Sequence, residues 1–201
     1  MLCCVVLYCS LYLRGSGCGL NWNSGVKLQK AAANTWTASV ECDQNTALEV
    51  KALLNDRTWM IGANHHVAVG SAGTTTVVYP WFNTYQGRTQ VFPRVYSPEL
   101  NNVRDVIVYF PPSYYENSLK VYKNVLIMHD GQNLFNHQTA FMGNAWLVQD
   151  TLNPMIVNGE MDEVLVVGVY NTANRTYEYT YSYDPSEGFG GDGDKYLDFL
   201  E

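Results

Sequence analysis

Short apolar runs alternate with polar positions along the first third of the chain, and Gly, Asn and Asp separate these runs. Three of them begin at residues 11, 34 and 47, with the sequences LYLRG, NTWTASVEC and ALEVKALLNDRTWM. Apolar and polar residues that alternate in short segments bounded by turn-forming residues are typical of antiparallel strands with one buried face. The step from LND to RTWM predicts a hairpin turn. We therefore expect residues 1–79 to form an antiparallel β-sandwich.

The pattern changes near residue 80, and a second unit is predicted over residues 80–201. Its first two strands are QVFPRVYS and VRDVIVYF, with a turn at PELNN between them. Pro111 and Pro112 end the second strand, because proline has no backbone N–H to donate. The later runs NVLIMH and VLVVGV are almost continuously apolar. Such runs predict strands that are covered on both faces.

Between these two runs, the segment GNAWLVQDTLNPMIVNG carries apolar residues at helical spacing. Trp146 opens this predicted helix and is expected to lie in the core. A strand, a helix and a strand of these lengths form a parallel βαβ unit. We therefore expect residues 80–201 to form an open α/β sheet, with a ligand site at the carboxyl ends of its strands. The final KYLDFLE predicts one more helix, and the fold class is mixed.

Composition narrows the possible functions. Apolar residues make up 47% and charged residues 15% of the 201 residues, which is too apolar for a disordered chain. The formal charge is −7 and the twelve Lys and Arg residues are scattered, so no basic surface for nucleic acid is predicted. The apolar start, MLCCVVLYCSLYL, falls short of the ~20 residues that span a bilayer. We expect a buried strand there, with a signal peptide as the alternative, and no membrane partner, and no localisation follows.

The cysteines and histidines predict no metal site. The five cysteines, at positions 3, 4, 9, 18 and 42, form no CxxC pair. Cys18 and Cys42 either form a disulfide or stay reduced, and the other three fit small apolar strand positions. His65 and His66 are neighbours on a predicted strand, so their side chains point to opposite faces. The glycine-rich GFGGDGDK follows a polar loop and lacks the GK[ST] ending of a nucleotide-binding loop.

The segment HDGQNLF, residues 129–135, follows a predicted buried strand at a glycine turn. Backbone N–H groups at such a turn can bind a ligand oxygen, although a simple turn is the alternative. Together with RDVIVYFPPSYYEN, GNAWLVQDTL, VLVVGVYNTANRTYEY and GGDGDKYLDFLE, it resembles the putative-esterase branch of the α/β-hydrolases, which includes enterochelin, feruloyl and esterase-D-like enzymes. The resemblance covers residues 104–201 and implies the N-terminal half of an α/β-hydrolase sheet.

The resemblance also implies roles for individual residues. The loop after the strand that ends at His129 would supply the first oxyanion N–H, from Gln132. Asn133, Asn171 and Arg175 would bind substrate, and Glu178 and Tyr179 would line the rim of the site. In the alternative interpretation, Asn171, Arg175, Glu178 and Tyr179 belong to a solvated loop. No cofactor is implied.

Ester hydrolysis on this fold requires a serine in a G-x-S-x-G turn, followed along the chain by an acid and a histidine. The 201 residues contain no such pentapeptide, and no histidine follows His137. We therefore interpret the chain as the N-terminal fragment of a serine carboxylic-ester hydrolase, with an ester as the substrate of the parent enzyme.

The first unit resembles a starch-binding carbohydrate module, through YLRGSGCGLNWNSGVKL, NTWTASVEC and LEVKALLNDRTWMIGANHHVAV. The resemblance implies a glycan site, with an α-glucan as one candidate ligand, built from Trp22, Lys51, Trp59 and Asn64. Met60 departs from the family pattern, which has a polar residue there. In the alternative interpretation both tryptophans are core residues. For the whole chain, the alternatives to an esterase fragment are a non-catalytic carbohydrate-binding protein and an inactive scaffold.

Overall fold

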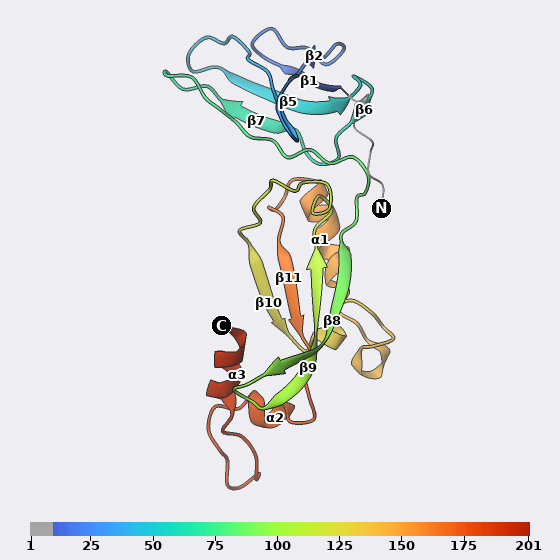
Figure 1. The fold of residues 1–201 in the computed structure, drawn as a ribbon, viewed down its shortest axis with the longest axis vertical. Coiled ribbons are helices and arrows are strands. Elements are labelled where there is room, and N and C mark those ends of the chain that lie inside the picture. Colours follow the sequence, from blue (N-terminus) through green and yellow to red (C-terminus); the bar gives the residue numbers. More distant parts are fainter. Residues whose placement is uncertain (1–9) are drawn as a thin grey trace. The chain divides into compact units, whose positions relative to one another are not determined.

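The computed structural model describes residues 10–201, which divide into two compact units (Figure 1). Each unit combines segments that are distant in the sequence. The first unit contains the residues up to Tyr85 together with Pro112–Val121 and Pro154–Asp162. The second unit contains Gln86–Pro111, Tyr122–Asn153 and Glu163–Glu201. The strand expected at Cys3, Cys4 and Cys9 lies outside the described residues.

The first unit is built from antiparallel strands, as the alternating pattern predicts. Its main sheet has five strands, in the order β2 (Val26–Lys27), β1 (Leu11–Ser16), β5 (Ala47–Leu54) and β6 (Thr58–Trp59), with β7 (His65–Ala68) also paired to β5. A separate ladder joins β3 (Gln29–Ala32) to β4 (Thr35–Thr37). The predicted hairpin turn between β5 and β6 is confirmed, and both Asn55 and Asp56 have the positive φ that tight hairpin turns require.

One face of the main sheet packs onto a small core. Ala52, Met60, Ile61 and Trp81 are buried together, with Val78, Phe82 and Val157 packed against them. Neighbouring strand residues point to opposite faces, so the burial of Met60 leaves Trp59 on the other face. Met60 departs from the carbohydrate-module pattern because its side chain fills this core.

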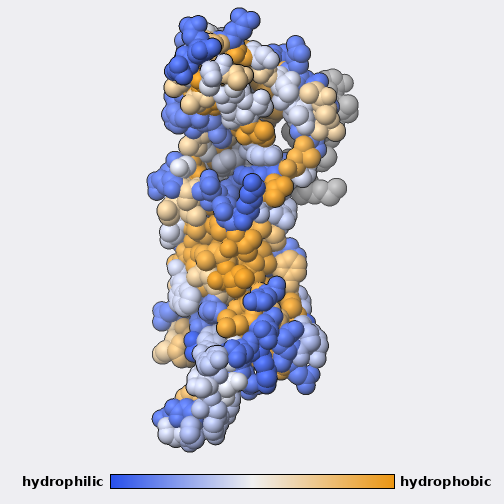
Figure 2. Space-filling model, turned by 90° about the vertical axis from the view of Figure 1, so that its left-hand side faces the viewer, coloured by the Kyte–Doolittle hydropathy of each residue, from blue (hydrophilic) through white to orange (hydrophobic). Residues whose placement is uncertain are grey.

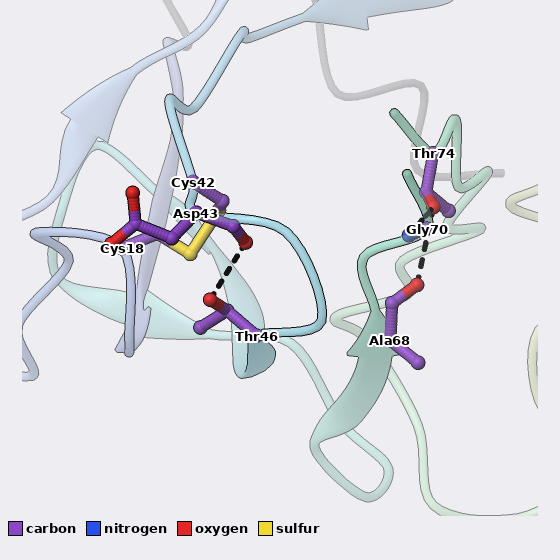
Figure 3. Close-up of a disulfide and its surroundings, with 7 residues drawn as sticks. All are labelled: Cys18, Cys42, Asp43, Thr46, Ala68, Gly70 and Thr74. Carbon is purple, nitrogen blue, oxygen red and sulfur yellow. Dashed lines mark hydrogen bonds between the residues drawn. A yellow bond between two sulfur atoms is a disulfide. The ribbon is translucent and has the colours of Figure 1, made fainter. Parts of the chain in front are cut away.

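A disulfide closes the loop that follows β1. Cys18 and Cys42 are bonded, which decides between the two alternatives that the sequence leaves open (Figure 3). Cys42 begins the turn that leads into β5, where the Thr46 hydroxyl donates to the carbonyl of Asp43 at 2.7 Å. The disulfide therefore ties the loop that carries Trp22 to the segment before β5.

The second unit contains a four-stranded mixed sheet. Its strand order is β10 (Val125–His129), β11 (Leu165–Val169), β9 (Asn102–Phe110) and β8 (Arg88–Ser97). β10 and β11 are parallel, with α1 (Val148–Val157) between them in the sequence, so the predicted βαβ order is confirmed. The other pairs are antiparallel. Two 3₁₀ turns follow β10, η1 (Gly131–Asn133) and η2 (Phe141–Gly143), and two helices follow β11, α2 (Arg175–Glu178) and α3 (Gly193–Leu200).

The predicted hairpin of β8 and β9 is also confirmed. The register shifts between Phe92 and Val95, where Pro93 cannot donate to the ladder and Arg94 has a positive φ of 56°. The backbone N–H of Arg94 donates instead to the Asp105 carboxylate at 2.9 Å. The proline thus produces a bulge, and the strand continues beyond it.

The prediction that β10 is covered on both faces is wrong. Val125, Leu126 and Ile127 are 54%, 44% and 45% exposed. β10 is the edge strand of the sheet in the described part of the chain, whereas β11 is central and mostly buried. Figure 2 shows an apolar patch on the side of the second unit where β10 runs. An apolar run alone does not distinguish an edge strand from a central one.

The prediction that Trp146 opens the helix from within the core is also wrong. Trp146 is 55% exposed, and α1 begins only at Val148. The backbone N–H of Trp146 donates to the carbonyl of Asn133 at 2.8 Å, and Leu147 has a φ of 52°. These two features keep Trp146 in the loop before the helix.

Candidate functional site

Trp22 and Trp59 lie next to each other on the first unit. Their ring centroids are 6.0 Å apart and the ring planes are tilted by 46°. Trp59 is 39% exposed and Trp22 is half-buried, so neither belongs to the buried core. Aromatic faces that remain accessible can stack on the C–H surface of a sugar ring.

The two tryptophans are held by different kinds of local structure. Trp59 lies on β6 and pairs with Leu53, whose side chain is completely buried in β5. Trp22 lies in the loop between β1 and β2. In this loop the Asn21 side chain accepts hydrogen bonds from the backbone N–H groups of Asn23 and Ser24. Such an Asx-type turn fixes the course of the chain around Trp22.

Lys51 shares the sheet face of Trp59. Lys51 lies opposite Arg14 in the ladder of β1 and β5, and it is two residues from Leu53, the partner of Trp59. Its Nζ donates to the carbonyl of Gly62 at 2.6 Å, and burial lowers the pKa of this amine. The bond to Gly62 uses one of the three N–H donors of Lys51.

Asn64 is connected to the same strand through a carboxylate. Its Nδ2 donates to Glu49 Oε1 at 2.8 Å, and Glu49 is two residues before Lys51 on β5. Asn64 therefore reaches the strand that carries Lys51, but its amide already has a protein partner. Of the four residues expected from the carbohydrate-module resemblance, Trp22 and Trp59 contact each other directly.

In the second unit, several expected residues converge on one carboxylate, that of Asp130. Asp130 follows β10 with a left-handed backbone, at φ 54°. Its carboxylate accepts hydrogen bonds from Asn171 Nδ2 at 2.7 Å, from Arg175 Nε and Nη2 at 2.9 and 2.8 Å, and from the Tyr179 hydroxyl at 3.3 Å. The Arg175 guanidinium lowers the pKa of Asp130. A carboxylate with this many donors is a fixed anchor rather than a proton carrier.

The glycine turn after Asp130 lies against β11. A side chain on Gly131 would collide with the carbonyl of Gly168 on the neighbouring strand, so only glycine fits there. Gln132 is held at two atoms: its Oε1 accepts from the backbone N–H of Asn171 at 3.2 Å, and its carbonyl accepts from the Thr139 hydroxyl at 2.7 Å. The loops that follow β10 and β11 thus bring Gln132 and Asn171 into contact.

Asn133 and Glu178 have structural partners that the sequence did not indicate. Asn133 Oδ1 accepts from the backbone N–H of Phe141 at 2.8 Å, so this side chain holds the loop that follows. Glu178 was expected at the rim of the site, and this expectation is wrong. Its side chain is 1% exposed and is ion-paired with Arg104. The ion pair with Arg104 allows the Glu178 carboxylate to be buried, so Glu178 lies in the interior and not at the rim.

His129 and Tyr196 adjoin the same cluster, although sequence reasoning did not select them. His129 Nδ1 lies 3.0 Å from the Tyr196 hydroxyl. The rings of His129, Tyr179 and Tyr196 have centroids 5.1 to 5.5 Å apart. Burial raises the pKa of both tyrosines, so their hydroxyl groups stay protonated. Tyr196 lies on α3, 67 residues from His129, and no local motif signals this contact.

Two kinds of site are not found in the described part of the chain. Residues 10–201 hold no group of three or more His, Cys, Asp or Glu side chains arranged for a metal ion. Among these same residues, no helix has the length and apolarity needed to cross a membrane.

No protein-family model and no curated protein matches the chain. Solved structures do match it in part. An IroE-like serine hydrolase from Shewanella oneidensis aligns with a TM-score of 0.43 and 23% identity, over 57% of this chain and 35% of that one. A ferulic acid esterase aligns with a TM-score of 0.39 and 21% identity, over 58% of this chain and 43% of that one. The chain thus spans less than half the length of either structure.

Proposed function

We propose that the first unit binds carbohydrate and that the second unit forms part of the acyl-transfer site of a carboxylic-ester hydrolase. In this proposal residues 1–79 are a carbohydrate-binding β-sandwich, and residues 80–201 are the N-terminal half of an α/β-hydrolase sheet. The protein would then take a glycan, such as an α-glucan, and a carboxylic ester as its partners.

The observation that carries the glycan proposal is the contact between Trp22 and Trp59. Two adjacent accessible rings offer a sugar chain more apolar area than one ring, at a small cost in side-chain entropy. Lys51 has N–H donors beyond the one that binds Gly62, and these can reach sugar hydroxyls. Asn64, whose amide binds Glu49, would contribute through its carbonyl oxygen.

Retention on an amylose column tests the glycan proposal. We expect the 201-residue chain to be retarded, and Trp22→Ala and Trp59→Ala each to abolish the retardation. Because the rings are accessible, each change should lower the free energy of unfolding by less than about 1 kcal/mol, against about 3–5 kcal/mol for a buried tryptophan. Trp146→Ala, in the second unit, removes an exposed tryptophan outside the pair and should leave retention unchanged.

Absence of retention of the wild type on amylose and on other glucans would overturn the glycan proposal. Unfolding of both tryptophan variants would also overturn it, because it would identify the rings as packing residues. Lys51→Ala should weaken retention less than either tryptophan change, since one hydrogen bond contributes only about 0.5–1.5 kcal/mol.

The observation that supports the ester-hydrolase proposal is the hydrogen-bonded turn at Asp130. It lies at the carboxyl end of β10, beside the loop that follows the parallel strand β11, where open α/β sheets bind their ligands. A backbone N–H that is fixed before the reaction stabilises a developing oxyanion without reorganisation. Gln132, whose side chain and carbonyl are both held, would supply that N–H. Asn171 and Arg175 would flank the substrate.

In this second proposal the 201-residue chain is part of a longer hydrolase, so the test uses the native protein from its source. Antibodies raised against the 201-residue chain would recover it from its source, and a fluorophosphonate probe would report a nucleophilic serine. We expect the native protein to be labelled and to hydrolyse p-nitrophenyl acetate. The 201-residue chain should do neither, because it contains no G-x-S-x-G. If the native protein is neither labelled nor active, the ester-hydrolase proposal is overturned, and carbohydrate binding remains as the proposed function.

A further inference from the structure

Arg14 on β1 contacts both tryptophans of the proposed glycan surface. Its Nη1 donates to the backbone carbonyl of Trp22 at 3.0 Å. The same guanidinium lies over the Trp59 ring, 5.4 Å from the ring centroid, in the range of a cation–π interaction. One side chain therefore links the loop that carries Trp22 to the strand that carries Trp59.

Asp56 fixes Arg14 in this orientation. Arg14 Nε donates to Asp56 Oδ1 at 2.8 Å, and Arg14 Nη2 donates to the Asp56 backbone carbonyl at 2.9 Å. The second carboxylate oxygen, Oδ2, accepts from the backbone N–H of Gly25 at 3.2 Å. Arg14 thus binds the loop at the carbonyl of Trp22, and Asp56 binds it at the N–H of Gly25.

The close fit around Asp56 also depends on Gly25. A side chain at position 25 would collide with Asp56 Oδ1 and would approach Tyr12 Cβ. The Arg14 side chain is only 16% exposed. The pair is therefore more constrained than an exposed surface salt bridge, in which two long side chains meet in open solvent.

We propose that Arg14 and Asp56 are positioning residues that hold Trp22 and Trp59 at the separation and tilt that glycan binding requires. The proposal rests on the glycan-binding function proposed above. Trp22 lies in a loop, and the hydrogen bond from Arg14 to its backbone carbonyl adds to the Asn21 turn in limiting the positions that the ring can take. Fixing the rings before the ligand arrives avoids an entropic cost of binding.

The guanidinium is needed for its shape as well as its charge. Its planar fork presents several N–H donors and an apolar face at the same time, so it binds Asp56 and Trp22 while it stacks on Trp59. A lysine at position 14 keeps the charge but has no planar face and no fixed pair of donors. Arg14→Lys therefore separates positioning from simple charge.

The test compares Arg14→Lys, Arg14→Gln and Asp56→Asn with Arg57→Gln, which removes an exposed arginine next to Asp56. Maltoheptaose is the probe, and its Kd is measured by titration calorimetry. Circular dichroism of the tryptophan bands is the spectroscopic readout, and Trp22→Phe identifies the part of the spectrum that comes from the pair. Thermal unfolding monitors the fold.

We expect Arg14→Lys to raise the Kd by about tenfold and to alter the tryptophan-pair signal. Arg14→Gln and Asp56→Asn should act in the same direction, and Arg57→Gln should change neither quantity. If Arg14→Gln fails to fold, Arg14→Lys and Asp56→Asn still provide the comparison.

Wild-type affinity in Arg14→Lys would overturn the proposal. A raised Kd with an unchanged tryptophan signal would also overturn it, because Arg14 would then act on the glycan and not on the rings. If the wild type binds neither maltoheptaose nor another glucan, the glycan function fails, and the tryptophan spectrum alone tests whether Arg14 positions the rings. An altered signal in Arg14→Lys would then support that role, and an unchanged signal would reject it.

Discussion

Arg104 on β9 and Glu178 at the end of α2 form an ion pair that is closed to solvent. Arg104 Nη2 lies 2.8 Å from Glu178 Oε1, and the two side chains are 0% and 1% exposed. Asn102 Nδ2 donates to the same oxygen at 2.9 Å, so the carboxylate has a donor besides Arg104. The guanidinium also lies over the rings of Tyr196 and Phe199 on α3, 5.3 and 5.1 Å from their centroids. The pair therefore connects β9 to both helices after β11.

We expect Glu178→Ala to lower the free energy of unfolding by about 3–5 kcal/mol, because it leaves the Arg104 charge buried without a partner. Urea unfolding measures this change, with the exposed Glu187→Ala as the control. The double change Arg104→Met with Glu178→Leu should recover most of the loss, since apolar groups of similar volume carry no charge to desolvate. A loss below 1 kcal/mol for Glu178→Ala would show that solvent reaches the pair.

Local patterns in the sequence predicted much of the fold. The alternating residues of β5 and the turn at Asn55 and Asp56 define a hairpin because both signals act over a few residues. The β8–β9 hairpin and α3 were predicted on the same basis. The exposure of β10 was not, because its apolar run has the same composition whether or not another strand pairs with it.

The candidate sites show the same limit. The resemblance to a carbohydrate module selected Trp22 and Trp59, and the two rings do lie together. It did not select Arg14, because the contacts of Arg14 with Trp22 and Asp56 depend on how three separate segments pack. Glu178 lies 74 residues from Arg104, and an acidic residue on a polar segment carries no local sign that it is buried.

The anchor at Asp130 should make the second unit sensitive to acid. Arg175 lowers the pKa of Asp130 in the folded state below its unfolded value of about 3.9. The folded state therefore gains stability from the ionised carboxylate above that unfolded value, and this gain is lost as the pH falls through the lower folded pKa. We expect Asp130→Asn to cost about 1.5–3 kcal/mol at pH 7 and less at an acid pH below the folded pKa of Asp130.

Urea unfolding of the wild type and of Asp130→Asn at both pH values measures this difference. Asp198→Asn, which changes an exposed aspartate on α3, is the control and should show no such pH dependence. A cost of Asp130→Asn that is equal at the two pH values would mean that its charge does not stabilise the fold.

The Cys18–Cys42 disulfide should stabilise the first unit mainly by restricting the unfolded chain. The two cysteines are 24 residues apart. For a loop of that length, the chain-entropy estimate is about 3–4 kcal/mol. We expect the variant with Cys18→Ser and Cys42→Ser to unfold at correspondingly lower urea. Dithiothreitol should destabilise the wild type but not this variant, and equal sensitivity of both would assign the effect of the reductant to another group.

Hydrogen exchange should distinguish the edge strand β10 from the central strand β11. β11 is hydrogen-bonded on both sides, whereas β10 pairs only with β11 in the described part of the chain. The amides of β10 that point away from β11 should exchange without any opening of the sheet, and those of β11 only after larger unfolding. Mass spectrometry of peptides that cover Val125–His129 and Leu165–Val169 measures the two rates. Equal slow exchange would contradict an open edge. Light scattering would then show whether a second copy of the chain covers Val125, Leu126 and Ile127, because an unpaired apolar edge favours strand addition.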